Sequence, residues 1–316
     1  MHPSDRPRRL LAIGPLPPGL HASLRERHEL VALWEQPDPG AFLREHRGRF
    51  DGGVTMSRHG CADAMFACFP DGVLACFGVG YESVDLDAAR RHRVQVSTTP
   101  DVLNDCVADL AFALVLAVAR RIPAADRHVQ AGRWPSSSYP LATRVSGKRL
   151  GIVGLGRIGQ AIARRAAGFD MALRYHGRAP KPCSGLEFEP DLAALARWAD
   201  FLVLSCPGGA ATRHLVSAGV LDALGPDGYL VNIARGSVVD ETALVEAVEQ
   251  GRIAGAALDV YADEPNVPAG LLGRDNVVTL PHIAASTRET RQAMERLVLD
   301  NLHAYFQTGA VLTPPA

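Results

Sequence analysis

Lysine is nearly absent from this sequence. Lys148 and Lys181 are the two lysines among 33 basic residues, so arginine carries almost all of the positive charge. Acidic residues number 34, and the formal net charge is −1. A chain without an excess of positive charge lacks the electrostatic attraction behind non-specific binding to nucleic acids and anionic membranes. We therefore expect no nucleic-acid partner and no membrane-surface partner.

Cysteine is also sparse. The six cysteines show no C-x-x-C spacing and no histidine at metal-ligand distance, which argues against a metal site. Cys76, Cys106 and Cys206 fall within apolar patterns that are typical of buried core thiols. Unpaired thiols persist in reducing compartments, so the sequence predicts a cytoplasmic protein.

Long apolar runs are missing as well. The longest covers residues 110–119, and a helix that spans a bilayer needs about 20 apolar residues. Near the N-terminus, Pro15, Pro17 and Pro18 interrupt the apolar residues, which is unlike a secretory signal. We expect a membrane-free protein whose 316 residues suit two domains or one large one.

Short apolar runs alternate with helical patterns along the chain. This alternation predicts parallel sheets with helices on both faces. A strongly apolar helix is expected at residues 101–121 and a shorter one at 126–132. The expected strands lie at 9–16, 30–35, 51–56, 72–78, 95–99, 150–153, 171–175, 201–206, 229–234, 254–260 and 277–280. The other expected helices lie at 40–47, 86–93, 160–167, 192–199, 221–224, 241–250 and 289–306.

Three glycines, Gly154, Gly156 and Gly159, follow the apolar run at 150–153 and precede a helical pattern. In a strand–turn–helix unit, the first glycine permits a tight turn and the second lets the backbone approach a pyrophosphate. The third packs the helix against the strand. The pattern predicts a dinucleotide site, and the alternative is a glycine-rich turn that only eases packing.

Functional residues of such sheets gather beyond the carboxyl ends of the strands. Reading those ends places Arg235, Glu264 and His282 among them. An arginine can bind a carboxylate with its planar fork, a histidine can donate a proton, and a glutamate can orient that histidine and favour its charged form. This trio would suit reduction of a 2-oxo acid. Taken singly, they could instead be a surface ion pair, a turn residue and a capped strand end.

Six ordered motifs make this interpretation more specific. They are FGVGYESVDL, TTPDVLNDCVADLAFALVLAVARRI, GLGRIG, NIARGSVVDE, GAALDVYADEP and LPHIAAST. Together they resemble the D-isomer-specific 2-hydroxyacid dehydrogenase family over essentially the whole chain, and most closely its hydroxypyruvate/glyoxylate and hydroxyphenylpyruvate reductases. The resemblance implies an α/β fold of two Rossmann-like, doubly wound parallel-sheet domains with a cleft between them. Residues 1–100 and 287–316 would form the substrate domain, and residues 101–286 the dinucleotide domain.

The resemblance also implies roles for single residues. Arg235 would bind the substrate carboxylate, Glu264 would orient and charge the histidine, and His282 would be the acid/base. Val79 and Gly80 would hold the substrate in a backbone anion nest, with Arg58 as a further contact, although that turn could equally be structural. The implied cofactor contacts are Val107, Gly154, Gly156, Arg157, Ile158, Gly159, His176, Gly177, Arg178, Lys181, Cys206, Pro207, Thr212, Ile233, Ala234, Arg235, Asp259, His282 and Ala284.

Three of these cofactor contacts can also be argued from the chemistry of their residues. Asp259 closes an apolar strand, where a carboxylate needs a partner, and the nicotinamide amide would supply one. The second strand of the glycine unit ends in Tyr175-His176-Gly177-Arg178 with no carboxylate before Glu187. A carboxylate there would hold a ribose 2′-hydroxyl, whereas Arg178 and Lys181 would bind a 2′-phosphate. We therefore expect NADP(H) to be preferred, with NAD(H) possible, unless these residues form only a solvated basic loop.

The expected reaction is reduction of a small 2-oxo acid to the D-2-hydroxy acid. Hydroxyphenylpyruvate-type or other D-2-hydroxyacid dehydrogenases are alternatives, and an NAD(H)-sensing, corepressor-like scaffold is an alternative from another class. Glu264 argues against a formate dehydrogenase, which has glutamine at that position. The resemblance further implies a homodimer, in which the loop bearing Trp134 and Tyr139 either enters the partner's pocket or is an ordinary surface loop.

Overall fold

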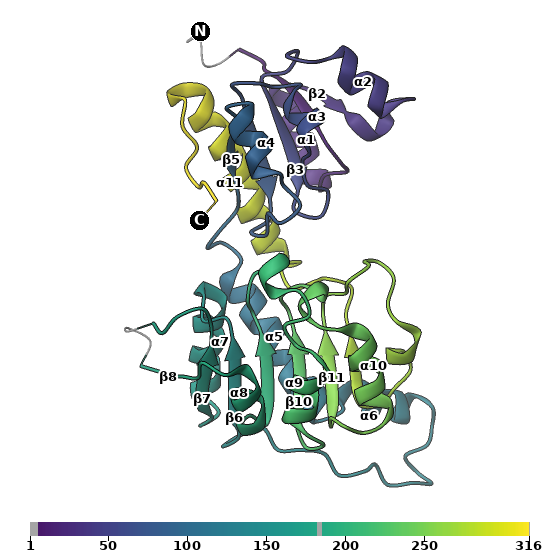
Figure 1. The fold of residues 1–316 in the computed structure, drawn as a ribbon. Coiled ribbons are helices and arrows are strands. Elements are labelled where there is room, and N and C mark those ends of the chain that lie inside the picture. Colours follow the sequence, from purple (N-terminus) through teal and green to yellow (C-terminus); the bar gives the residue numbers. More distant parts are fainter. Residues whose placement is uncertain (1–5, 182–184, 316) are drawn as a thin grey trace. The chain divides into compact units, whose positions relative to one another are not determined.

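The computed structural model describes residues 6–181 and 185–315. The chain divides into two compact units: residues 1–103 with 287–316, and residues 104–286 (Figure 1). The chain therefore leaves the first unit, completes the second, and returns to the first with its last helix.

The first unit is built on a five-stranded parallel sheet in the order β2-β1-β3-β4-β5. Its strands are β1 Arg9–Ala12, β2 Glu29–Ala32, β3 Gly52–Met56, β4 Val73–Phe77 and β5 Gln95–Ser97. Its helices are α1 Pro18–Arg27, α2 Pro39–Glu45, α3 Asp63–Phe66, α4 Leu86–Arg91 and α11 Arg288–Thr308. This order reverses direction between β1 and β3, as in flavodoxin-like sheets.

The C-terminal segment is tied to the first unit. Helix α11 packs against β4, and the backbone N–H of Thr98 donates to the carbonyl of Thr313 at 3.0 Å. The fully buried Asn301 side chain accepts from the N–H groups of Leu312 and Thr313 at 2.9 and 3.0 Å. These bonds place the chain end beside β5.

The second unit is built on a seven-stranded parallel sheet in the order β12-β11-β10-β9-β6-β7-β8. Its strands are β6 Arg149–Val153, β7 Ala172–His176, β8 Glu187–Phe188, β9 Phe201–Leu204, β10 Tyr229–Asn232, β11 Gly255–Leu258 and β12 Val277–Thr279. Its helices are α5 Asn104–Ala119, α6 Ile122–Gln130, α7 Arg157–Ala167, α8 Leu192–Trp198, α9 Ala218–Leu224 and α10 Glu241–Glu249. The strand order reverses between β6 and β9.

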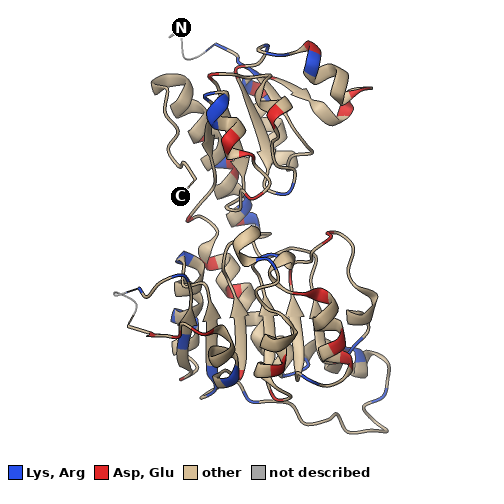
Figure 2. Ribbon diagram, in the orientation of Figure 1, with Lys and Arg blue, Asp and Glu red and all other residues tan. Residues whose placement is uncertain are grey.

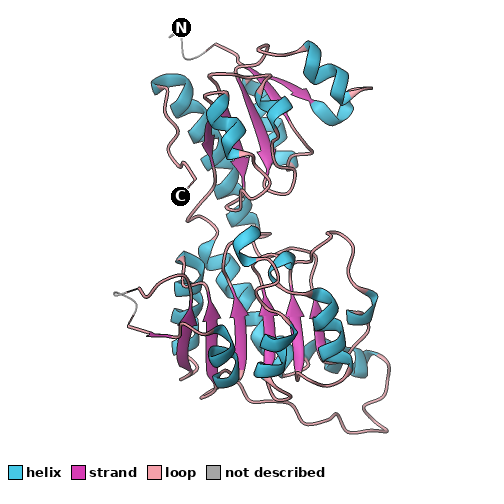
Figure 3. Ribbon diagram, in the orientation of Figure 1, coloured by secondary structure: helices cyan, strands magenta, loops and turns pink. Residues whose placement is uncertain are grey.

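Helices cover both faces of this second sheet (Figure 3). Strands β9, β10 and β11 are buried along their whole length, as their mostly apolar sequences predict. Charged residues of both signs lie mostly on helices and loops (Figure 2). Within the described ranges, no helix is long and apolar enough to cross a bilayer.

The expected fold class is confirmed: both units contain doubly wound parallel sheets flanked by helices. Every expected strand exists, although most are shorter than their apolar runs. Helices α1 and α3 and the two-residue strand β8 were not expected. Helix α1 buries only Leu20 and Leu24, which is too sparse an apolar pattern to mark a helix in sequence.

Candidate active site

The glycine loop between β6 and α7 meets the demands of a phosphate-binding turn. Gly154 has φ +95°, and a Cβ there would lie 2.6 Å from the backbone of Cys206. A Cβ at Gly159 would lie 2.3 Å from the carbonyl oxygen of Gly154. Gly156 caps α7, and a Cβ there would meet nothing within 4 Å. The start of α7 is therefore open, and its N–H groups and dipole suit a pyrophosphate.

The neighbouring strand supports this loop. Beyond β9, the Ser205 hydroxyl donates to the carbonyl of Gly154 at 2.8 Å, a contact that the sequence did not indicate. Burial raises the pKa of the Cys206 thiol to about 11, so Cys206 shapes the loop rather than acting as a nucleophile. The Thr212 hydroxyl donates to the Pro207 carbonyl at 2.8 Å, which fixes the next turn.

The end of β7 carries positive charge. Arg178 and Lys181 are both exposed, and the hydroxyl of buried Tyr175 accepts from the N–H of Lys181 at 2.6 Å. Glu187, the first carboxylate after the strand, forms an ion pair with Arg174 at 2.9 Å. His176 donates through Nδ1 to the carbonyl of Glu189 at 3.1 Å. No acidic residue stands between His176 and Glu187 in the sequence, and Glu187 is paired with Arg174.

Buried Asn232, at the end of β10, builds the turn that carries Arg235. Its Oδ1 accepts from the N–H of Ala234 at 3.0 Å, and its Nδ2 donates to the carbonyl of Arg235 at 3.0 Å. Arg235 itself donates to the Ala234 carbonyl at 2.7 Å. Asn232 was missed in the sequence, although an amide within the apolar run at 229–234 was a usable signal.

Glu264 and His282 form a direct pair. His282 Nδ1 and Glu264 Oε2 lie 2.8 Å apart, while Glu264 Oε1 accepts from the N–H of Tyr261 at 3.2 Å. Burial alone would raise the pKa of Glu264, but the hydrogen bond to His282 and the charges of His282 and Arg235 outweigh it and lower that pKa. Glu264 is thus held ionised beside the imidazole. The three residues singled out in the sequence come together in one cluster.

Asp259 has partners other than the one expected. Its carboxylate is fully buried and accepts from the N–H groups of Ile283 and Ala284, both at 2.8 Å. Burial raises the pKa of Asp259, although these two bonds act against that rise. The nicotinamide amide is therefore not needed to satisfy this carboxylate. Asp259 instead secures the turn at His282, whose φ of +54° is unfavourable for a side chain with a Cβ.

The substrate residues expected in the first unit lie beyond β3 and β4. Val79 and Gly80 are partly exposed, after Gly78, whose φ is +144°. The N–H of Gly78 donates to the Thr99 hydroxyl at 3.1 Å. Arg58 donates from Nε to Nε2 of His59 at 3.1 Å.

The remaining expected cofactor residues all lie in the second unit. Val107 is buried in α5, with 5% of its surface exposed. Arg157 and Ile158 open α7, and Ile233, Ala234 and Ala284 are buried beside the turns described above.

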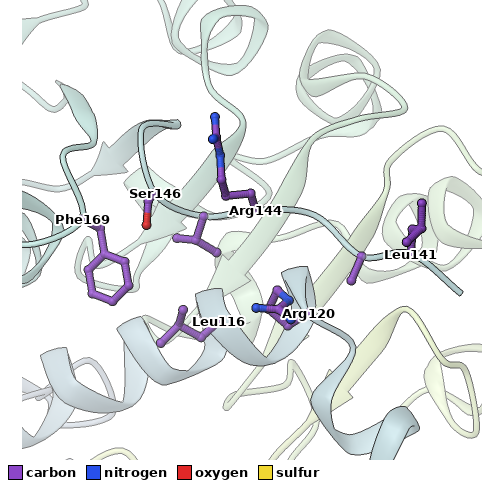
Figure 4. Close-up of a pocket in the computed structure, with 8 residues that line it drawn as sticks. Leu116, Arg120, Leu141, Arg144, Ser146 and Phe169 are labelled. Atoms are coloured by element: carbon purple, nitrogen blue, oxygen red, sulfur yellow. The ribbon is translucent and has the colours of Figure 1, made fainter. Parts of the chain in front are cut away.

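A separate cavity of about 360 Å³ lies between the C-terminal part of α5, residues 141–146 and Phe169 (Figure 4). Leu116 and Phe169 give it an apolar wall, and Arg120 and Arg144 stand at its edge. It contains none of the residues of the glycine loop or of the Arg235, Glu264 and His282 cluster.

The described cysteines and potential metal ligands lie apart from this cluster or within its backbone support. Five described cysteines are free thiols, and Cys183 lies outside the described residues. Cys76 and Cys206 are buried as expected, while Cys106 is half-buried and donates to the Ala284 carbonyl at 3.0 Å. No group of three His, Cys, Asp or Glu side chains in the described ranges is arranged to hold a metal ion.

Residues 112–284 match the protein-family model described as D-isomer specific 2-hydroxyacid dehydrogenase, NAD binding domain. The chain is 41% identical to glyoxylate/hydroxypyruvate reductase A of Arabidopsis thaliana, covering 96% of this chain and 98% of that one. It is 42% identical to hydroxyphenylpyruvate reductase of Plectranthus scutellarioides over the same shares.

Solved structures agree with these matches. A 2-hydroxyacid dehydrogenase from Ketogulonicigenium vulgare matches with a TM-score of 0.91 and 41% identity, covering 98% of this chain and 99% of that one. An NADPH-dependent glyoxylate/hydroxypyruvate reductase from Sinorhizobium meliloti, solved with NADP and malonate, matches with a TM-score of 0.90 and 41% identity, covering 98% and 97%.

Proposed function

Since the chain belongs to the D-isomer-specific 2-hydroxyacid dehydrogenase family, we propose that it reduces a small 2-oxo acid of the glyoxylate or hydroxypyruvate type to the D-2-hydroxy acid. The observation that carries this proposal is the 2.8 Å pair between Glu264 and His282, next to Arg235 in the unit that contains the glycine loop. The names of the relatives support the substrate class.

The residues have complementary roles in this reaction. A bound nicotinamide cofactor supplies the hydride that the substrate's 2-oxo carbon accepts. Glu264 occupies Nδ1 of His282, so Nε2 is the atom left to donate a proton to the carbonyl oxygen. Arg235 binds the substrate carboxylate through its guanidinium fork. The carbonyl thus gains one hydride and one proton, and becomes the hydroxyl group.

The cofactor is proposed to lie along the carboxyl ends of β6, β7 and β9. The open start of α7 suits the pyrophosphate. Exposed Arg178 and Lys181 suit a 2′-phosphate, so NADP(H) is the proposed preference and NAD(H) a usable alternative. The NADPH-dependent relative from Sinorhizobium meliloti supports this choice.

Other parts of the proposal rest on the sequence. Val79, Gly80 and Arg58 are proposed to contact the substrate. The protein is proposed to act as a homodimer. A cytoplasmic location is also proposed, supported by the free thiols among the described residues.

The test is a steady-state panel with NADPH and NADH. Glyoxylate, hydroxypyruvate, 4-hydroxyphenylpyruvate and 2-ketogluconate span the substrates in the relatives' names. The proposal predicts the highest kcat/KM with glyoxylate or hydroxypyruvate and NADPH. A preference for 4-hydroxyphenylpyruvate would assign the substrate to that branch instead. Tight nucleotide binding without turnover of any 2-oxo acid would refute the enzyme and favour a nucleotide-sensing scaffold.

A further inference from the structure

The turn that carries Glu264 is held from outside the cluster. Glu241, the first residue of α10, accepts from the backbone N–H of Ala262 through Oε1 at 2.8 Å. Ala262 lies two residues before Glu264 and directly after Tyr261, whose own N–H donates to Glu264. Glu241 therefore fixes the peptide that sets the position of the Glu264 carboxylate.

Close packing leaves this turn little freedom on its other side. A Cβ at Gly236 would lie 1.8 Å from the carbonyl carbon of Tyr261 and 2.1 Å from the nitrogen of Ala262. Gly236 directly follows Arg235, so the two turns touch through their backbones. The Tyr261 hydroxyl also donates toward the carbonyl of Leu280, two residues before His282, at 3.1 Å. A shift at Ala262 would thus be felt by all three residues of the cluster.

Acidic neighbours act on Glu241. It is half-buried, and its pKa is raised chiefly by burial and further by the charges of Asp263 and Glu264. The charges that act on Glu264 itself are those of His282 and Arg235. Glu241 therefore contributes to the cluster through its hydrogen bond from Ala262.

We propose that Glu241 is a positioning residue for the reductase reaction, which acts through Glu264 by anchoring the 261–264 turn. This inference rests on the proposed function. The contribution of Glu241 is the acceptor oxygen that the N–H of Ala262 needs.

Three variants test it. Glu241→Ala removes the acceptor, Glu241→Gln keeps an acceptor oxygen for Ala262, and exposed Thr242→Ala on the same turn of α10 is the control. The readouts are kcat, KM for NADPH and the alkaline limb of the kcat profile. Thermal unfolding is recorded for each variant.

We expect Glu241→Ala to lower kcat about tenfold, with KM for NADPH within about twofold of wild type. Its alkaline limb should move to lower pH by about half a unit or more, because the carboxylate of Glu264 is no longer held at the imidazole. Glu241→Gln should stay close to wild type in kcat and in the alkaline limb, because its amide oxygen still accepts from Ala262. Thr242→Ala should match wild type in all readouts.

A wild-type kcat and limb in Glu241→Ala would overturn the proposal, as would equal losses in both Glu241 variants. If Glu241→Ala does not fold, Glu241→Asp, whose carboxylate is one methylene shorter, takes its place, and a wild-type kcat and limb in that variant overturn the proposal. Each of these results leaves wild-type turnover intact, whereas failure of the proposed function would show as a wild-type protein without turnover.

Discussion

The neighbours of His282 determine which of its ring nitrogens a substrate could use. Glu264 pairs with Nδ1 of His282, and Asp259 secures the backbone after His282, so Nε2 is the ring nitrogen that the proposed proton transfer would use. The sequence motifs identified the cluster, because each residue follows a strand. The partners of Asp259 could not be predicted, because they depend on the tertiary structure that brings the N–H groups of Ile283 and Ala284 to the end of β11.

Arg178 should set the choice of cofactor. Arg178→Ala removes an exposed guanidinium after β7. It should lower kcat/KM for NADPH by about ten- to a hundredfold and change kcat/KM for NADH about twofold or less. The reason is that a charge-assisted contact is worth about 1.5–3 kcal/mol before solvent screening. Arg197→Ala on α8, also exposed, is the matched control and should leave both cofactors unaffected. Equal kcat/KM for the two cofactors in wild type, unchanged by Arg178→Ala, would show that this turn does not contact the phosphate.

The central strands of the second sheet are linked by an ion pair at their starts. Strands β6 and β9 lie side by side, and Asp200 links their starts by accepting from the backbone N–H of Arg149 at 2.8 Å and from its guanidinium at 2.9 and 3.1 Å. Burial alone would raise the pKa of Asp200, but the bonds to Arg149 outweigh it and lower that pKa. The ionised carboxylate therefore stabilises the fold.

Asp200→Asn should lower the free energy of unfolding by about 1–2 kcal/mol at neutral pH, because charge-assisted bonds are lost. Since the pKa of Asp200 is lower in the folded protein, its contribution is present above the unfolded value of about 3.9 and is lost as the pH falls through the folded value. The difference in unfolding free energy between Asp200→Asn and wild type, measured by urea unfolding, should thus shrink as the pH is lowered from neutral. Asp275→Asn, in the exposed pair with Arg127, is the control and should change stability by about 0.5 kcal/mol or less. A loss equal to that control at neutral pH would contradict this account.

Elements were predictable where burial leaves a strong pattern. The strands from β9 to β12 are mostly apolar runs, and helix α5 is apolar nearly all round, so both were evident in sequence. Strand ends were harder, because apolar residues such as Ile233 and Val260 continue to be buried in the turns beyond the strands. The glycine loop was predictable because two of its positions, Gly154 and Gly159, are constrained by contacts that a Cβ would violate, while Gly156 leaves the start of α7 open.

As a whole molecule, the chain exposes apolar side chains on one part of its second unit. Ile122 and Val129 of α6 are 51% and 52% exposed, and Trp134 and Leu141 in the following loop are 68% and 98% exposed. Exposed apolar residues clustered along one segment favour burial against another chain. This observation supports the expected homodimer.

The combined change Val129→Asp and Leu141→Asp should convert a wild-type dimer into a monomer in sedimentation velocity, because charges would be buried in the interface. Leu312→Asp, at a residue of the first unit that is 57% exposed, is the control and should remain dimeric. A wild-type protein that is a fully active monomer at assay concentration would rule out the homodimer.

Glu264→Gln tests how the cluster titrates as a unit. The lowered pKa of Glu264 means that its carboxylate stays ionised to lower pH than an ordinary glutamate, so wild type should keep this support across the whole neutral range. Without this charge 2.8 Å from Nδ1 of His282, the alkaline limb of the kcat profile should move to lower pH by about one unit. A profile that coincides with wild type would mean that Glu264 does not act on His282.

The central claim is that His282 donates the proton as the 2-oxo acid is reduced. Its most direct measurement is single-turnover oxidation of bound NADPH by hydroxypyruvate, compared between wild type and His282→Gln, together with the Kd for NADPH. We expect the rate to fall by on the order of 10²–10⁴-fold in the variant, while the Kd stays within about threefold, because the lost interaction belongs to the transition state. A variant that oxidises NADPH at a rate close to wild type would contradict the account.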